Sequence, residues 1–78
     1  FMFDPENLYQ NLSTIFGIPI EMVNNKMTME NSECWDSLKH MALITMVEDK
    51  YNLTLSMDEI VEMTSIEAIS KVLDKKIH

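Results

Sequence analysis

The spacing of apolar residues at the start of the chain predicts an α-helix. Apolar positions recur there every three or four residues, which is the repeat of a helix with one buried face. Asp4 and Pro5 suit its start, because Asp caps free backbone N–H groups and Pro fits the first helical position. Gly17 suits its end, because Gly readily adopts the left-handed C-cap conformation. We expect the buried face to consist of Leu8, Leu12, Ile15 and Phe16.

Residues 18–36 show no sustained repeat and are predicted to form a long connection. Pro19, the pair Asn24-Asn25 and the polar run over 30–33 argue against a regular element, although one helical turn fits residues 20–23. Loops of this length are uncommon in compact domains unless they have a function. The connection is therefore a place to look for a site.

A second long helix is predicted over residues 38–51, which contain no Gly or Pro. Asp36 and Ser37 are both good N-cap residues for it. The helix is apolar on two opposite faces: Leu43, Ile44, Val47 and Tyr51 on one, and Leu38, Met41, Ala42 and Thr45 on the other. The second face is either buried as well or exposed for contact with partners. We favour exposure, because so short a chain cannot easily bury both faces.

Two capping-box patterns predict the remaining helices. Ser56 with Glu59 opens a short helix that ends near Met63, and Thr64 with Glu67 opens the last one. The inner face of the last helix is expected to comprise Ile66, Ile69, Val72 and Leu73. The predicted fold is therefore all-α: a four-helix bundle of three main helices and one short helix, with the long loop between the first two. A single domain spans residues 1–78, and Phe1 before Met2 is expected to be an added residue.

Charge and composition exclude several classes of protein. Thirteen acidic residues against six lysines give a net charge of −7, which disfavours binding to nucleic acid or to an anionic membrane. The acidity either suits basic protein partners or simply keeps the protein soluble. A single Cys and two His provide neither a disulfide nor a Cys-ligated metal site. No apolar stretch reaches the ~20 residues that span a bilayer, and no secretory signal is visible, so we expect a cytoplasmic protein.

The candidate chemistry lies where the long loop becomes the second long helix. A serine at this junction is exposed, and the free N–H groups and dipole of the helix start favour a negatively charged substituent on it. The triplet Asp36-Ser37-Leu38 resembles the signature of acyl and peptidyl carrier proteins. The similarity extends from Leu8 to Leu73 and includes segments 20–25, 47–51, 58–59 and 63–66.

This resemblance implies a non-catalytic carrier. A phosphopantetheinyl transferase would move 4'-phosphopantetheine from coenzyme A to Ser37. This arm would hold acyl groups as thioesters. Asp36 would help the transferase to dock. Acyl-transferring or condensing enzymes of fatty-acid, polyketide or related biosynthesis would bind a monomer through basic patches. The implied partner-binding residues are Leu38, Met41, Ala42, Thr45, Glu48, Asp49, Asp58, Glu59 and Glu62.

Several positions depart from the family pattern. Cys34-Trp35 replaces the Gly-small pair that often precedes the triplet, Lys39 and His40 stand where acids or small polar residues are common, and Ala42 replaces a frequent acid. A dedicated pathway for a polyketide, a peptide or a surface polysaccharide is therefore open. We interpret Trp35 as a packing anchor, Cys34 as a half-buried thiol and His40 as a surface residue.

Two other functions and one feature of the core stay open. The chain could be a peptidyl or aminoacyl carrier, although its acidity and length favour the acyl type. It could also be an unmodified helical adaptor in which Ser37 only caps a helix. The eight Met residues could line an interior that opens to shelter an acyl chain, or they could be ordinary core residues.

Overall fold

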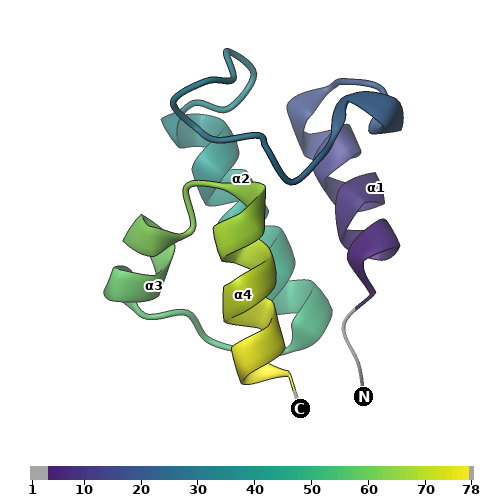
Figure 1. The fold of residues 1–78 in the computed structure, drawn as a ribbon. Coiled ribbons are helices and arrows are strands. Elements are labelled where there is room, and N and C mark those ends of the chain that lie inside the picture. Colours follow the sequence, from purple (N-terminus) through teal and green to yellow (C-terminus); the bar gives the residue numbers. More distant parts are fainter. Residues whose placement is uncertain (1–3, 78) are drawn as a thin grey trace.

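The computed structural model describes residues 4–77 and confirms the all-α prediction. Its elements are α1 (Pro5–Phe16), the 3₁₀ turn η1 (Ile20–Met22), α2 (Ser37–Tyr51), α3 (Met57–Glu62) and α4 (Ile66–Lys76). Figure 1 shows α4 in front of α2, with α1 and α3 on opposite sides of this pair. No helix in the described part is long and apolar enough to cross a membrane. The prediction about Phe1 lies outside the described residues.

The two ends of α1 are those that the sequence predicts. The side chain of Asp4 accepts a hydrogen bond from the backbone N–H of Glu6 at 3.1 Å, and Pro5 is the first helical residue. Gly17 ends the helix in the left-handed conformation with φ 68°, and its N–H donates to the carbonyl of Ser13. These caps satisfy backbone groups that the helix itself leaves free.

The core lies between α1, α2 and α4. Leu8, Leu12 and Phe16 of α1 pack there, and Ile15 is only half-buried at its edge. Within residues 4–77 the other buried apolar residues are Val23, Met27, Trp35, Leu43, Ile44, Val47, Leu55, Met63, Ile66, Ile69, Val72 and Leu73. Among the methionines of residues 4–77, Met27 and Met63 are core residues, Met29 and Met46 are half-buried against the core, and Met22, Met41 and Met57 are exposed.

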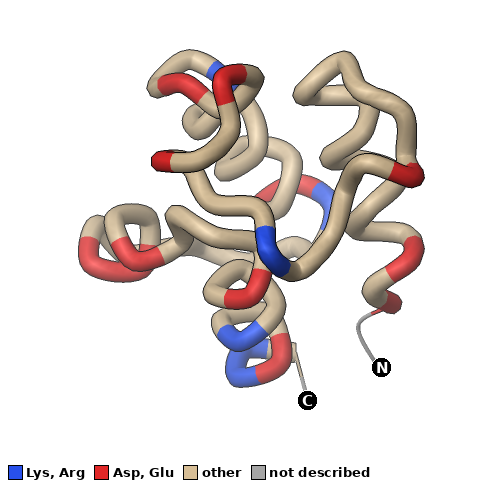
Figure 2. The backbone as a smooth tube through the Cα atoms, turned by 45° about the horizontal axis from the view of Figure 1, so that its top comes forward, with Lys and Arg blue, Asp and Glu red and all other residues tan. Residues whose placement is uncertain are grey.

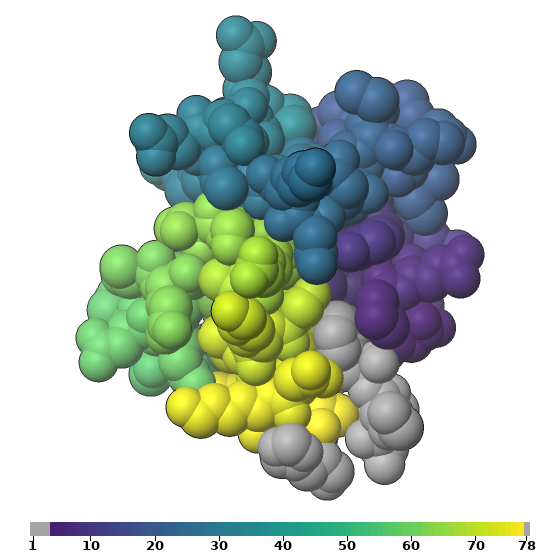
Figure 3. Space-filling view, in the orientation of Figure 1, coloured from purple at the N-terminus to yellow at the C-terminus, as the bar shows by residue number. Residues whose placement is uncertain are grey.

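The long connection is ordered by its own hydrogen bonds rather than by a regular element. The side chain of Asn31 accepts from the N–H of Thr28 at 2.9 Å and donates to the carbonyl of Lys26 at 3.1 Å. Val23 and Met27 reach from the connection into the core. Figure 3 shows this segment as a continuous layer over one end of the bundle. The connection is therefore an ordered layer that covers the end of the bundle where α2 begins.

The start of α4 differs from the prediction by one residue. Thr64 was expected as the cap, but Ser65 is the N-cap, and its hydroxyl accepts from the N–H of Ala68 at 3.0 Å. The reason is a short antiparallel bridge between Thr28 and Ser65, in which the carbonyl of Thr64 accepts from Met29 at 2.8 Å. This bridge holds Ser65 in an extended conformation, so the helix begins at Ile66.

Candidate functional site

Ser37 is the first residue of α2 and is exposed. The preceding residue, Asp36, is the N-cap: its backbone is extended, and its Oδ1 accepts from the N–H of Lys39 at 2.9 Å. The carbonyl of Asp36 accepts from the N–H of His40 at 2.8 Å and so begins the helical ladder. Because Asp36 caps the helix, the hydroxyl of Ser37 is not needed for capping.

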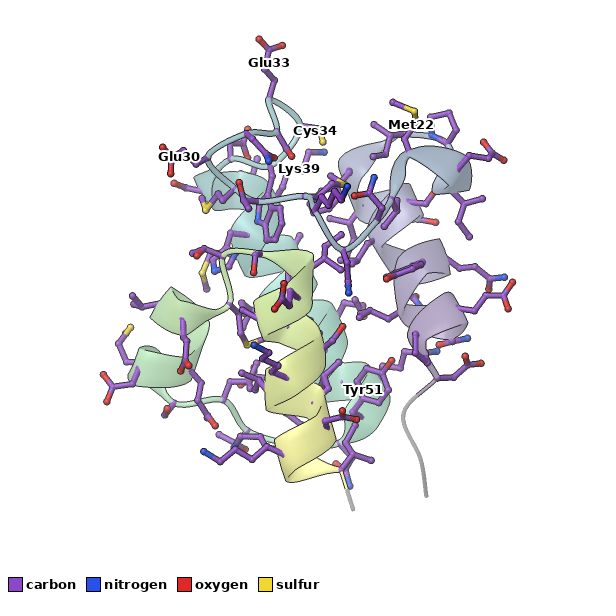
Figure 4. All side chains as sticks on the ribbon, in the orientation of Figure 1. Met22, Glu30, Glu33, Cys34, Lys39 and Tyr51 are labelled. Carbon is purple, nitrogen blue, oxygen red and sulfur yellow. The ribbon has the colours of Figure 1, made fainter. Side chains whose placement is uncertain are left out.

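The start of α2 favours a negative group on Ser37. The first N–H groups of an α-helix have no partner within the helix, and the helix dipole places partial positive charge there. Asp36 satisfies the N–H of Lys39, which leaves those of Ser37 and Leu38 without a partner in the helix. Figure 4 shows Lys39 close to this end, with Glu33 and Cys34 on the adjoining loop. A phosphate ester is therefore compatible with this position.

Trp35 anchors the loop directly before this site, as predicted. Its side chain is 2% exposed, and its ring lies 5.1 Å from the ring of Phe16 between centroids. Cys34, next to it, is half-buried, which agrees with its interpretation as an ordinary thiol. The burial of Trp35 two positions before Ser37 holds the loop against the core while Ser37 stays at the surface.

The prediction that His40 is a surface residue is wrong. Its side chain is buried, accepts from the indole N–H of Trp35 through Nδ1 at 3.1 Å, and contacts the carbonyl of Ile60 through Nε2 at 2.9 Å. The expectation rested on the lack of a second His or acid at a matching helical spacing. Both true partners lie outside α2, so no spacing within the helix could reveal them.

One face of α2 is exposed and apolar, as predicted. Leu38 is 77% exposed and Met41 53%, and Ala42 and Thr45 on the same face are exposed as well. Asp49 continues this face toward the end of the helix. The opposite side of α2 is buried, although Tyr51 at its end is only half-buried. The second apolar face is thus available at the surface and is not part of the core.

The candidate acids divide into free and engaged groups. Asp49, Asp58 and Glu62 are exposed. Glu48 accepts from the N–H of Leu55 at 3.0 Å and so fixes the chain between α2 and α3. In Figure 2, acidic positions gather on α3, whereas lysines gather near the end of α4.

Glu59 has the most internal partners among these acids. It completes the predicted capping box with Ser56, accepting the Ser56 N–H at 2.8 Å, and it pairs with Lys76 at 3.1 Å. The hydrogen bond from the Ser56 backbone holds the pKa of Glu59 below its usual value, and Lys76 lowers the pKa further. The carboxylate of Glu59 therefore helps to hold α3 in place.

The sequence reading missed two exposed apolar residues beside these acids. Met57 and Val61 are 73% and 66% exposed on α3. Their spacing of four residues in a helix with three acids was the available signal. They add apolar surface to the acidic short helix.

Comparison with known proteins places this arrangement in a family. A holo acyl carrier protein from Geobacter metallireducens, solved by NMR in solution, superposes with a TM-score of 0.82 at 22% identity, over 97% of this chain and 87% of its own. No curated protein matches the chain. No group of three potential metal ligands occurs within residues 4–77. Residues 6–73 match the family described as phosphopantetheine attachment site, and the chain therefore belongs to this family of non-catalytic carriers.

Proposed function

We propose that the chain is an acyl carrier protein in which Ser37 bears the 4'-phosphopantetheine arm. The observation that carries this proposal is the position of Ser37. It is exposed as the first residue of α2, and its hydroxyl is not used as a cap because Asp36 caps the helix. A phosphodiester at this hydroxyl meets the positive end of the helix dipole and free N–H groups. The terminal thiol of the arm would then carry acyl groups as thioesters.

The reaction that loads the arm needs no catalytic group from this chain. A phosphopantetheinyl transferase activates the hydroxyl of Ser37, which attacks the β-phosphate of coenzyme A. A phosphodiester bond forms, and adenosine 3',5'-bisphosphate leaves. Asp36 keeps one carboxylate oxygen on the N–H of Lys39 and can offer the other to the transferase. The carrier therefore supplies position and charge, whereas the transferase supplies the chemistry.

The proposed partner surface combines the exposed face of α2 with the acids of α3. Leu38 and Met41 offer the apolar contact, and Asp49, Asp58 and Glu62 offer charge toward basic patches of acyl-transferring or condensing enzymes. Charges of this kind mainly raise the association rate and set orientation. Weak, fast exchange suits a monomeric shuttle that meets several enzymes in the cytoplasm.

The pathway and the cargo remain part of the proposal. Fatty-acid and polyketide biosynthesis both use such carriers, and the exposed Ala42 on the α2 face supports a dedicated partner set. Two loading assays separate an acyl carrier from a peptidyl carrier. One offers malonyl or longer acyl groups, and the other offers amino acids with an adenylating enzyme. We expect acyl loading only.

The proposal is tested by incubating the protein with coenzyme A and a broad-specificity phosphopantetheinyl transferase. Intact mass spectrometry should show the addition of one arm to the wild type and none to Ser37→Ala. Ser56→Ala is the matched control, because Ser56 is also an exposed serine at a helix start and should leave the modification intact. A wild type of unchanged mass would contradict the proposal and favour an unmodified adaptor.

A further inference from the structure

His40 forms a buried link between three parts of the chain. Its ring lies on the first turn of α2, accepts from the indole of Trp35 in the long connection, and reaches the backbone of α3 at Ile60. The Trp35 and His40 side chains are 2% and 8% exposed, so water contributes little to either group. In Figure 1, α3 lies at the side of the molecule away from α1.

The two contacts assign one tautomer to the ring. The indole nitrogen of Trp is a donor only, so Nδ1 of His40 must accept and carries no proton. The hydrogen of the neutral ring then lies on Nε2, which donates to the carbonyl of Ile60 at 2.9 Å. Every polar atom of the Trp35 and His40 rings thereby has a partner.

The contact with Ile60 matters because α3 is held by few groups. The helix has six residues and none of them is fully buried; Ile60 is half-buried against the core, and Met63, directly after the helix, is buried. Its beginning is tied by the Ser56 and Glu59 capping box and by Lys76, which also donates to the carbonyl of Thr54 at 3.0 Å. Near its end, the carbonyl of Ile60 is one of the last four that a helix leaves without an internal partner. His40 supplies that partner from α2.

We propose that His40, oriented by Trp35, is a positioning residue that fixes the end of α3 relative to the start of α2. That this placement of α3 also serves the docking of partner enzymes rests on the proposed function. The link keeps the acids of α3, Asp58 and Glu62, in register with Ser37, which lies three residues before His40. Loss of the Nε2–H donor would release the end of α3 while leaving the rest of the bundle folded.

Three substitutions separate the two halves of the link. His40→Gln places an amide N–H near the position of Nε2 and can keep the bond to Ile60. His40→Asn places an amide oxygen near Nδ1 and can keep only the bond from Trp35. His40→Leu removes both. The series therefore tests the α3 contact against the Trp35 contact in otherwise similar proteins.

Amide hydrogen exchange in the unmodified protein provides the local measurement. The amides of Ile60 and Met63, which donate to Ser56 and Glu59, report on α3, and the amide of Ile69 reports on α4. We expect exchange of the two α3 amides to accelerate about tenfold in His40→Leu and His40→Asn, because one net hydrogen bond is lost. His40→Gln should stay near the wild type, and Ile69 should be unaffected in all three variants.

Equal acceleration of Ile69 and the α3 amides would contradict the proposal, because it would mean a general loss of stability. Unchanged α3 exchange in His40→Leu would contradict it too. ¹⁵N chemical shifts of the wild-type imidazole provide a check without substitution: they should show Nε2 protonated, and a proton on Nδ1 would overturn the assignment.

The docking part is measured by arm transfer at a temperature where every variant is folded. The KM of the transferase for the carrier should rise several-fold in His40→Leu, with kcat little changed, and His40→Gln should restore it. An unchanged KM would overturn the docking part. If the wild type accepts no arm, the proposed function fails, whereas the exchange and ¹⁵N results still decide whether His40 positions α3.

Discussion

Asp36 is expected to have two separable roles, and substitution can distinguish them. As an N-cap it accepts the N–H of Lys39 at 2.9 Å, and as a charge it stands beside the serine that we propose to be modified. Asp36→Ala removes both the cap and the charge. Asp36→Asn keeps a good cap and removes only the charge, because Asn caps helices about as well as Asp.

The magnitudes follow from these two contributions. Loss of a side-chain cap costs about 1 kcal/mol of unfolding free energy. Loss of a negative charge at an exposed helix start costs about 0.5 kcal/mol through the dipole. We therefore expect Asp36→Ala to lose about 1.5 kcal/mol and Asp36→Asn about 0.5 kcal/mol. For a domain of this size, each 1 kcal/mol lowers Tm by about 4 to 8 °C.

The assay combines thermal and urea unfolding, followed by circular dichroism, with the rate of arm transfer by the transferase. Both Asp36 variants should slow transfer by about tenfold, because the charge that faces the partner is lost in each. Asp4→Ala is the matched control, since Asp4 caps α1 in a similar way and lies far along the chain from Ser37. It removes the same two contributions, so it should lose about 1.5 kcal/mol of stability, but it should transfer the arm at the wild-type rate.

Two results would refute this reasoning about Asp36. If Asp36→Asn destabilises the protein as much as Asp36→Ala, the cap bond is not what Asp36 contributes. If Asp36→Asn accepts the arm at the wild-type rate, its charge has no role in docking. Equal slowing of transfer in Asp4→Ala would show that the rate follows stability alone.

Three further predictions concern the core, the pH dependence and the charged surface. Leu43 is fully buried on α2, so Leu43→Ala should lower the free energy of unfolding, measured in urea, by about 2 to 5 kcal/mol. Leu38 lies on the exposed face, so Leu38→Ala should change it by less than about 0.5 kcal/mol. Similar losses in both variants would contradict the assigned faces. The lowered pKa of Glu59 means that its contribution to stability is present above its unfolded pKa and is lost as the pH falls through the folded value. In urea unfolding at neutral pH, Glu59→Gln should therefore be less stable than the wild type, and the difference should shrink as the pH is lowered into the acid range; a difference that does not change with pH would contradict this role. Raising the salt concentration from about 0.05 M to 0.5 M should lower kcat/KM of the transferase for the carrier several-fold, because exposed acids steer its approach; a rate independent of salt would argue against a charged docking surface.

Much of the fold was predictable because its determinants are local. The limits of α1 follow from Asp4, Pro5 and Gly17, and the start of α3 follows from the reciprocal cap of Ser56 and Glu59. In each case the groups that form the cap lie within a few residues of one another. Such contacts can be read from a sequence because the chain brings these groups together without tertiary structure.

The errors arose where residues distant in sequence decide the structure. His40 has partners five and twenty positions away, on two different segments. The start of α4 depends on a bridge between Thr28 and Ser65, which no pattern near residue 65 could reveal. The inward roles of Glu48 and Glu59 depend on Leu55 and Lys76 in the same way.

The position of Ser37 at the start of α2 was predictable from the sequence because the geometry of a helix start is local. The order of an N-cap, an exposed first residue and an apolar outward face is set by Asp36 and the helical repeat. The sequence did not reveal which acids are exposed and available to partners, because this depends on contacts that form only in the folded chain. Met57 and Val61 were missed as well, although their spacing of four residues places both on one face of α3.

The central claim is that one hydroxyl, that of Ser37, receives the arm. Fragmentation mass spectrometry of protein treated with coenzyme A and transferase locates the modified residue directly. The account predicts that fragments containing Ser37 carry the whole added mass and that fragments covering Ser32, Ser56, Ser65 and Ser70 carry none. An arm on any other residue, or no arm on a folded wild-type protein, would contradict it.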